Sequence, residues 1–170
     1  MDGQNKWKGH LKKCLLISGV FLLVSGIGFA FYVSDYYRSD PVAIETLEQE
    51  NVEVLGDFTV ILPEKPGNSA VIFYPGGKVE HSAYLPLLEE ISQHGITCIL
   101  AKMPFNLAVF DIYKADGILG TMPEIEYWFL AGHSLGGIMA SVAAEHNTLV
   151  HGLILLGSYL YSDFPVEKTL

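Results

Sequence analysis

The sequence predicts an α/β domain, built as a three-layer sandwich with a mostly parallel sheet, behind one N-terminal transmembrane helix. Three observations lead to this fold class. Residues 14–33 form an uncharged run of twenty residues. Short apolar, β-branched runs at 69–74 and 96–101 alternate with helical segments, which is typical of a parallel sheet covered on both faces. Finally, an aromatic and apolar run followed by small residues across 126–147 predicts a strand, a sharp turn and a helix.

The uncharged run is long enough to cross a bilayer, because twenty helical residues span about 30 Å. Four lysines precede it, which places residues 1–13 in the cytoplasm and the remainder of the chain outside, on a single-pass protein of the cell membrane. The alternative is a signal peptide cleaved near Val24-Ser25-Gly26, but such peptides have a shorter apolar region. We therefore expect an uncleaved anchor that contacts the lipid bilayer. The lysines are Lys6, Lys8, Lys12 and Lys13.

After the anchor, residues 34–50 are polar and predict a juxtamembrane linker or short helix. The α/β domain is then expected over 51–170. Its first element is a predicted hairpin, with strands at 52–55 and 58–62 joined at Gly56-Asp57.

Two helices and a last strand complete the expected order. Helices are predicted at 82–93 and 107–119, the second with a kink near Gly117. The apolar run 151–157 predicts the strand that follows the helix of the 126–147 segment. Since no further strand follows, this apolar strand would form an exposed edge, which is a hazard for aggregation.

Charge and cysteine content exclude several classes of protein. The first 33 residues carry a net charge of +3 and residues 34–170 a net charge of −12, which argues against nucleic acid as a partner. Two cysteines, Cys14 in the apolar run and Cys98 in a strand, cannot form a disulfide framework. No cluster has zinc-ligand spacing and no loop has a phosphate-binding pattern, so we expect no metal and no cofactor.

Gly132-His133-Ser134-Leu135-Gly136 is a G-x-S-x-G pattern placed between the predicted strand and helix. This context predicts a nucleophile elbow, in which Ser134 stands in a strained turn with its hydroxyl exposed. Gly132 and Gly136 supply the small residues that the turn needs. The amide of Leu135 would be one donor of an oxyanion hole. The alternative is an ordinary Gly-Ser turn.

The second oxyanion donor is expected in the loop after the strand at 69–74. Pro75-Gly76-Gly77-Lys78 follows that strand directly, and the two glycines leave backbone N–H groups free to face a ligand. We assign the region of Gly76 and Gly77 without choosing the donating amide. A plain Pro-Gly turn is the alternative.

The order of these motifs resembles the α/β-hydrolase superfamily, and more narrowly the membrane-tethered bacterial members of its dienelactone-hydrolase-like branch. The resemblance covers about residues 50–165 and implies Ser134 as nucleophile, Leu135 and the Gly76–Gly77 loop as oxyanion donors, and hydrolysis of an ester-like substrate. It is carried by PGGKV at 75–79, MPFNLA at 103–108 and GHSLGG at 132–137.

The chain departs from the family at its C-terminus, where an acid and a histidine are expected after later strands. Asp163 follows the 151–157 strand at a position where a minority of the superfamily carries its acid, but a solvated loop residue is the favoured interpretation. The sequence therefore predicts the N-terminal part of a hydrolase, cut short by truncation, gene splitting or frameshift. A second chain supplying the missing strands is the alternative.

None of the six histidines is a convincing base for Ser134. His133 lies inside the elbow and is expected to point away from the serine side chain, and His81 is the nearest remaining candidate because it follows the oxyanion loop. The others fit surface or helix-end positions: His10, His94, His146 and His151.

Three functions stay open. The favoured one is an anchored serine hydrolase that forms an acyl-enzyme on Ser134. A non-catalytic relic or anchored binding module would retain the pocket without the base. An acyltransferase would use the same serine with a different acceptor.

Overall fold

The computed structural model describes residues 2–165, and these divide into two compact units between Asp35 and Tyr36. The first unit is a single helix, α1 (Asp2–Ser34), which begins well before the predicted start at residue 14. Within the described residues, His10–Ser34 is the one helical stretch long and apolar enough to cross a membrane. Its apolar side chains are exposed, as a bilayer-facing surface requires.

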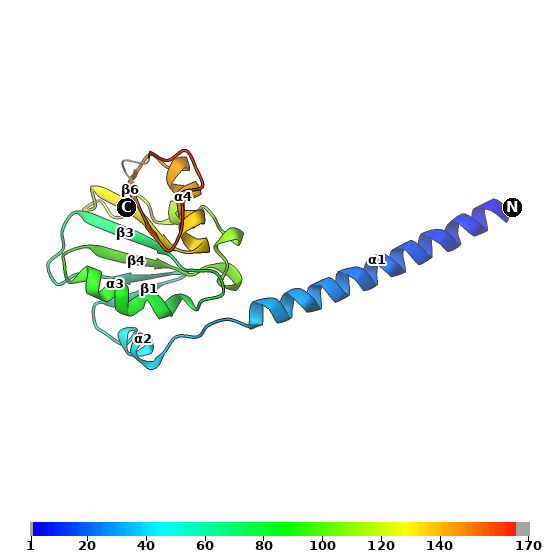
Figure 1. Cartoon of the computed structure of the whole chain (residues 1–170), viewed down its shortest axis with the longest axis horizontal. Coiled ribbons are helices and arrows are strands. Elements are labelled where there is room, and N and C mark those ends of the chain that lie inside the picture. The colour runs from blue at the N-terminus through cyan, green and yellow to red at the C-terminus, as the bar shows by residue number, and fades with distance from the viewer. Residues whose placement is uncertain (1, 166–170) are drawn as a thin grey trace. The chain divides into compact units, whose positions relative to one another are not determined.

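The second unit is built on a six-stranded sheet in the order β1-β2-β4-β3-β5-β6 (Figure 1). Strands β4, β3, β5 and β6 are parallel to one another, while β2 pairs antiparallel with β1 and with β4. The predicted mostly parallel sheet and its opening hairpin are therefore confirmed. The strands are β1 (Val52–Leu55), β2 (Phe58–Ile61), β3 (Ser69–Tyr74), β4 (Thr97–Ala101), β5 (Tyr127–His133) and β6 (Val150–Leu156).

Helices cover both faces of this sheet, as alternation along β3 illustrates. Ile72 belongs to the core cluster beneath α4 (Leu135–His146), whereas Val71 and Phe73 belong to the cluster beneath α3 (Leu85–Ser92). Successive side chains of a strand point to opposite faces of the sheet, so the apolar residues of β3 contribute to both cores. Figure 1 shows α3 and α4 on opposite sides of the sheet.

The helix predicted at 82–93 begins as a 3₁₀ turn, η1 (His81–Tyr84).

The predicted helix at 107–119 is wrong, because this stretch forms short 3₁₀ turns. The buried hydroxyl of Tyr74 donates to the carbonyl of Ile112 at 2.9 Å and accepts the N–H of Ala115 at 2.8 Å. A continuous α-helix would need those two backbone groups for its own hydrogen bonds. The turns are η2 (Pro104–Asn106), η3 (Ala108–Phe110) and η4 (Lys114–Gly117).

The segment predicted as a linker, 34–50, is bound to the sheet domain from residue 36 onward. The N–H of Tyr37 donates to the carbonyl of Lys78 at 2.8 Å, and the N–H of Glu80 donates back to Tyr37 at 2.8 Å. A short helix, α2 (Pro41–Thr46), follows and is capped by the side chain of Asp40. The segment from residue 36 onward is therefore hydrogen-bonded to the loop that follows β3.

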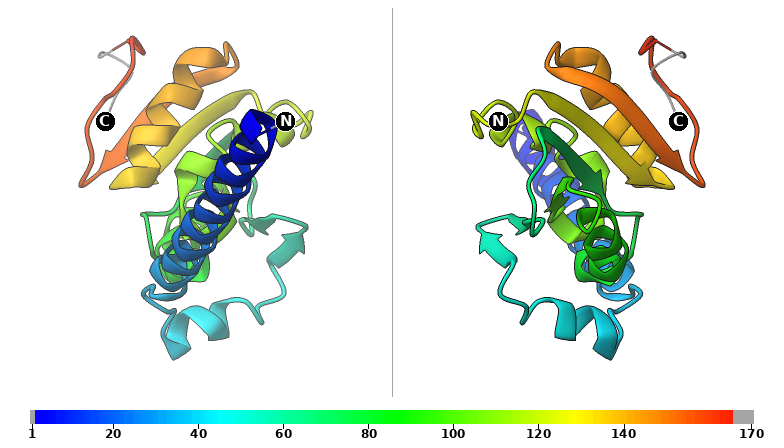
Figure 2. Two further views of the ribbon diagram at one scale, coloured as in Figure 1. Left: turned by 90° about the vertical axis from the view of Figure 1, so that its right-hand side faces the viewer. Right: turned by 90° about the vertical axis from the view of Figure 1, so that its left-hand side faces the viewer.

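Strand β6 lies at the edge of the described sheet, where the sequence places an apolar edge. Beside it, between α3 and β6, an open apolar groove of about 460 Å³ is lined by side chains such as Phe129 and Ile154. After β6 the chain turns back beside α4, where the N–H of Tyr161 donates to Ser141 at 3.1 Å (Figure 2).

Candidate active site

Ser134 stands in a strained turn between β5 and α4. Its backbone has φ 51° and ψ −122°, a conformation that costs a non-glycine residue free energy and that clusters at functional sites. The N–H of Ser134 donates to the carbonyl of Leu156 in β6 at 3.0 Å, which holds the turn against the neighbouring strand. The residue is exposed, so its hydroxyl is open to a ligand.

The glycines on either side of Ser134 lie where backbone passes close to backbone. A Cβ atom on Gly132 would lie 2.5 Å from the nitrogen of Gly137, and one on Gly136 would overlap the carbonyl oxygens of Tyr74 and Pro75. Any larger residue would push α4 away from the ends of β3 and β5. These contacts explain why the G-x-S-x-G pattern has glycine at both places.

Leu135 and Gly77 bring two backbone amides close to the serine. Leu135 is the first residue of α4, where helical N–H groups have no partner within the helix. A Cβ on Gly77 would lie 2.9 Å from Cδ2 of Leu135, so the loop after β3 lies against the elbow. Within the described residues, no hydrogen bond is recorded for the amide of Gly77.

The amide of Gly76 already has a partner, which narrows the assignment made from sequence. The N–H of Gly76 donates to the hydroxyl of Tyr84 at 3.0 Å. Of the two glycines assigned from sequence, Gly77 is thus the one with an amide available to a ligand. Sequence analysis did not single out Tyr84. Its signal was an aromatic residue with a polar tip, eight residues after Gly76, in the first turn of a helix.

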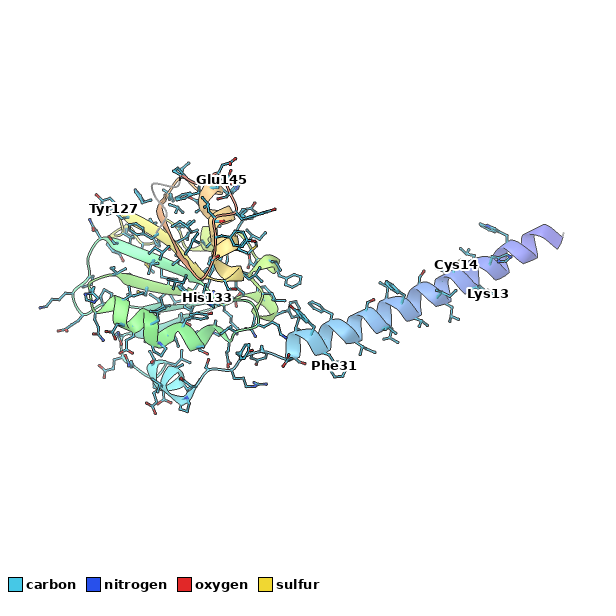
Figure 3. All side chains as sticks on the ribbon, in the orientation of Figure 1. Lys13, Cys14, Phe31, Tyr127, His133 and Glu145 are labelled. Atoms are coloured by element: carbon cyan, nitrogen blue, oxygen red, sulfur yellow. The ribbon has the colours of Figure 1, made fainter. Side chains whose placement is uncertain are left out.

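His133 turns away from Ser134, as the sequence suggested. Its Nδ1 lies 2.9 Å from the Tyr84 hydroxyl, and its Nε2 lies beside Gly157. Figure 3 shows His133 and Tyr127 at opposite ends of β5. His133 is therefore oriented toward the loop after β3 rather than toward the serine hydroxyl.

No other histidine of the described residues bonds to Ser134. Burial lowers the pKa of His81, and the charge of Lys102 lowers it further against the opposing charge of Glu80. His146 ends α4 and packs on the ring of Tyr113. Of the remaining three, His10 lies in α1, His94 lies just after α3, and His151 lies at the start of β6.

Asp163 is not brought to the site. It lines a depression with Glu145 and Asn147 at the C-terminal end of α4, whereas Ser134 precedes the first residue of that helix. Twelve helical residues separate the two ends by roughly 18 Å. Figure 3 places Glu145 at that far end. The position of Asp163 therefore fits the solvated loop residue favoured from the sequence.

Among the described residues, no group of three or more His, Cys, Asp or Glu side chains could hold a metal ion.

Solved structures with the same fold include proteins from several bacteria. The chain is similar to TT1662 from Thermus thermophilus, with a TM-score of 0.54 and 15% identity over 70% of this chain and 61% of that one. It is also similar to Thermogutta terrifontis esterase 2 phosphonylated by sarin, with a TM-score of 0.53 and 14% identity over 66% of this chain and 55% of that one. For the Francisella virulence factor BioJ, the TM-score is 0.54 and the sequence identity is 18%. The match covers 69% of this chain and 47% of that one. These likenesses show the fold.

The chain spans 47% to 61% of the length of these three solved proteins. None of the curated protein sequences matches it. A family model described as the alpha/beta hydrolase family matches residues 70–168, which is more than half of the chain. That range includes the loop after β3, the elbow at Ser134 and β6. The chain belongs to the alpha/beta hydrolase family.

Proposed function

We propose that this protein is a membrane-anchored serine hydrolase that cleaves ester-like acyl substrates through an acyl-enzyme on Ser134. The observation that carries the proposal is the strained, exposed conformation of Ser134 at the N-terminus of α4. A buried or unstrained serine in an ordinary turn would have no need of such a backbone. Esterase 2 of Thermogutta terrifontis, which has the same fold, supports the reaction class.

In the proposed reaction, the general base takes the proton of the Ser134 hydroxyl as Oγ attacks the acyl carbonyl, and the leaving group departs as the alcohol with that proton. Water then cleaves the acyl-enzyme, which releases the acid and restores Ser134. The amides of Leu135 and Gly77 would donate to the oxyanion that develops in each tetrahedral intermediate. Backbone donors of this kind are worth about 10²- to 10³-fold in rate each. The positive end of the α4 dipole adds to the stabilisation of this negative charge.

We infer that the general base and its acid are not among the residues that the structure describes, and we propose that a second chain supplies them. Two facts support this inference. Within the described residues, no hydrogen bond is recorded between the hydroxyl of Ser134 and a histidine or carboxylate. In addition, the chain spans 61% of the length of TT1662 and 55% of the length of esterase 2, two solved proteins with the same fold.

The proposed location is the cell membrane, with residues 1–13 in the cytoplasm and the hydrolase domain on the outer side. The hydropathy and length of His10–Ser34 support a membrane span. The four lysines in the first 13 residues support the orientation. The substrate would therefore be a small ester-like molecule that reaches the extracytoplasmic side.

Acyl-enzyme trapping tests the proposal directly. Membranes from the native cells are incubated with short-chain p-nitrophenyl esters and quenched in acid, and the peptide containing Ser134 is analysed by mass spectrometry. An acyl adduct on Ser134, lost in Ser134→Ala and retained in the control Ser162→Ala, is the expected result. An adduct that persists elsewhere in the protein when Ser134 is replaced contradicts the proposed nucleophile.

A second candidate is a non-catalytic binding module, favoured because no hydrogen bond to the hydroxyl of Ser134 is recorded among the described residues. It predicts the same fold and the same strained turn without any acyl adduct. Trapping therefore separates the two candidates, because only the hydrolase forms a covalent intermediate.

A further inference from the structure

The hydroxyl of Tyr84 connects two segments that lie beside Ser134, the loop after β3 and the end of β5. Its oxygen accepts the N–H of Gly76 at 3.0 Å and lies 2.9 Å from Nδ1 of His133. Gly76 belongs to the loop after β3, and His133 is the last residue of β5. One side chain from η1 thus connects the oxyanion loop to the residue that precedes the nucleophile.

The partners recorded for the Tyr84 hydroxyl indicate where its proton lies. A backbone N–H can only donate, so the Tyr84 oxygen is the acceptor toward Gly76. Within the described residues, Nδ1 of His133 is the one recorded partner that can accept the hydroxyl proton, so we assign this hydrogen bond from Tyr84 to His133. In a neutral imidazole this assignment leaves the ring proton on Nε2, the nitrogen beside Gly157.

The surroundings keep this arrangement in place. The ring of Tyr84 packs against Phe73, with ring centroids 4.8 Å apart. Burial raises the pKa of Tyr84 against the opposing effect of the Gly76 hydrogen bond, so the hydroxyl keeps its proton at neutral pH. A Cβ on Gly76 would lie 2.6 Å from Nδ1 of His133 and 2.9 Å from the Tyr84 oxygen, so only glycine allows this approach.

We propose that Tyr84 is a positioning residue for the oxyanion hole, which acts by holding Gly76 and His133 through its hydroxyl. With the amide of Gly76 turned toward Tyr84, the amide of Gly77 remains for the substrate and the loop is held against Leu135. The proposal rests on the proposed function for its catalytic consequence. The hydrogen-bond arrangement can be measured without any catalysis.

The first test is the tautomer of His133 in the full chain. Detergent-solubilised protein labelled with ¹⁵N-histidine is examined by long-range ¹H–¹⁵N NMR, and the resonance is assigned with His133→Asn. The expected wild-type state has Nε2 protonated and Nδ1 unprotonated. A neutral His133 protonated on Nδ1 overturns the proposal, and this result needs no variant of Tyr84 to fold.

The variant Tyr84→Phe removes only the hydroxyl and is expected to give a mixture of tautomers at His133. Tyr127→Phe is the matched control, because Tyr127 packs edge-on against His151 with centroids 5.3 Å apart and should leave His133 unchanged. An unaltered His133 tautomer in a folded Tyr84→Phe protein overturns the proposal.

The second test is the rate at which a fluorophosphonate labels Ser134 in native membranes. Tyr84→Phe is expected to label about 10- to 100-fold more slowly, since a misplaced oxyanion donor costs rates of this order. His133→Asn, which keeps an acceptor near the Nδ1 position, should label faster than His133→Ala.

The outcomes of this test separate the two claims. Labelling of Tyr84→Phe at the wild-type rate overturns the positioning role alone. Failure of the folded wild-type protein to label overturns the proposed function, and the positioning role with it, whatever tautomer His133 adopts.

Discussion

The backbone N–H of Ser134 donates to the carbonyl of Leu156 at 3.0 Å, and this bond ties the strained elbow to the edge strand of the sheet. A second contact reinforces it, because the hydroxyl of Ser158 donates to the carbonyl of Ser134 at 2.8 Å. The conformation of the proposed nucleophile is therefore held from β6 and the residues just after it. Strain at a functional residue persists only where the surrounding structure fixes it in this way.

Gly136→Ala is expected to destabilise the protein by about 3 kcal/mol or more, because the added methyl group overlaps the carbonyl oxygens of Tyr74 and Pro75. Neither backbone group can move without shifting β3. Thermal unfolding followed by circular dichroism measures the effect. Gly117→Ala is the control, since its methyl group meets only the ring of Phe58 at ordinary distance. Equal melting temperatures for the two variants would show that the elbow tolerates a larger residue.

Tyr74→Phe is expected to cost about 2 kcal/mol of stability, because it leaves the N–H of buried Ala115 without its acceptor. The same change frees the carbonyl of Ile112 and should loosen the turns at 104–117. Denaturant unfolding measures the free energy, with Tyr113→Phe as control because that ring is half exposed. A loss of less than a few tenths of a kcal/mol would mean that the hydroxyl does not shape this loop.

Stability is expected to fall on acidification through the titration of His81. Burial and Lys102 lower its pKa in the folded state, so below the ordinary value of 6.5 the unfolded chain binds a proton more readily than the folded one. The stabilising contribution of the neutral ring is therefore present above pH 6.5 and is lost as pH falls through the folded pKa.

This pH dependence can be measured from urea unfolding at pH 8 and pH 5. His81→Gln should show a smaller loss between the two values than the wild type, whereas His94→Gln, at an exposed position, should match the wild type. Identical pH dependence in the wild type and His81→Gln would contradict the assignment.

The strands and the elbow could be predicted from sequence because their signals are local. Apolar, β-branched runs such as 69–74 report burial on both faces of a sheet, and glycines at 132 and 136 report a tight turn. For the same reason the predicted order of the strands agrees with the structure, as do the helix after the 69–74 strand and the helix after the elbow.

The 107–119 stretch and Tyr84 could not be predicted, because both depend on contacts distant in sequence. The backbone of Ala115 bonds to Tyr74, forty-one residues away, and that hydroxyl replaces helical hydrogen bonds. Likewise, Tyr84 and His133 are separated by 49 residues, and only the folded sheet brings them together. Local periodicity carries no record of such pairs.

A comparison of native membranes with the isolated chain tests where the base comes from. Since the site as described holds no base bonded to Ser134, fluorophosphonate labelling of the purified 170-residue chain should be at least about 100-fold slower than labelling in native membranes. Circular dichroism confirms that the purified chain is folded. Equal rates in the two preparations would place the base within this chain, and His81→Gln would then be the first variant to examine.

The most direct measurement is fluorophosphonate labelling in native membranes that contain either the wild-type protein or Ser134→Ala at equal abundance. The account predicts that the wild-type protein is labelled at Ser134 and that labelling disappears in the variant. A wild-type protein that is present, folded and unlabelled, or a Ser134→Ala variant labelled at the wild-type rate, would contradict the assignment of Ser134 as the nucleophile.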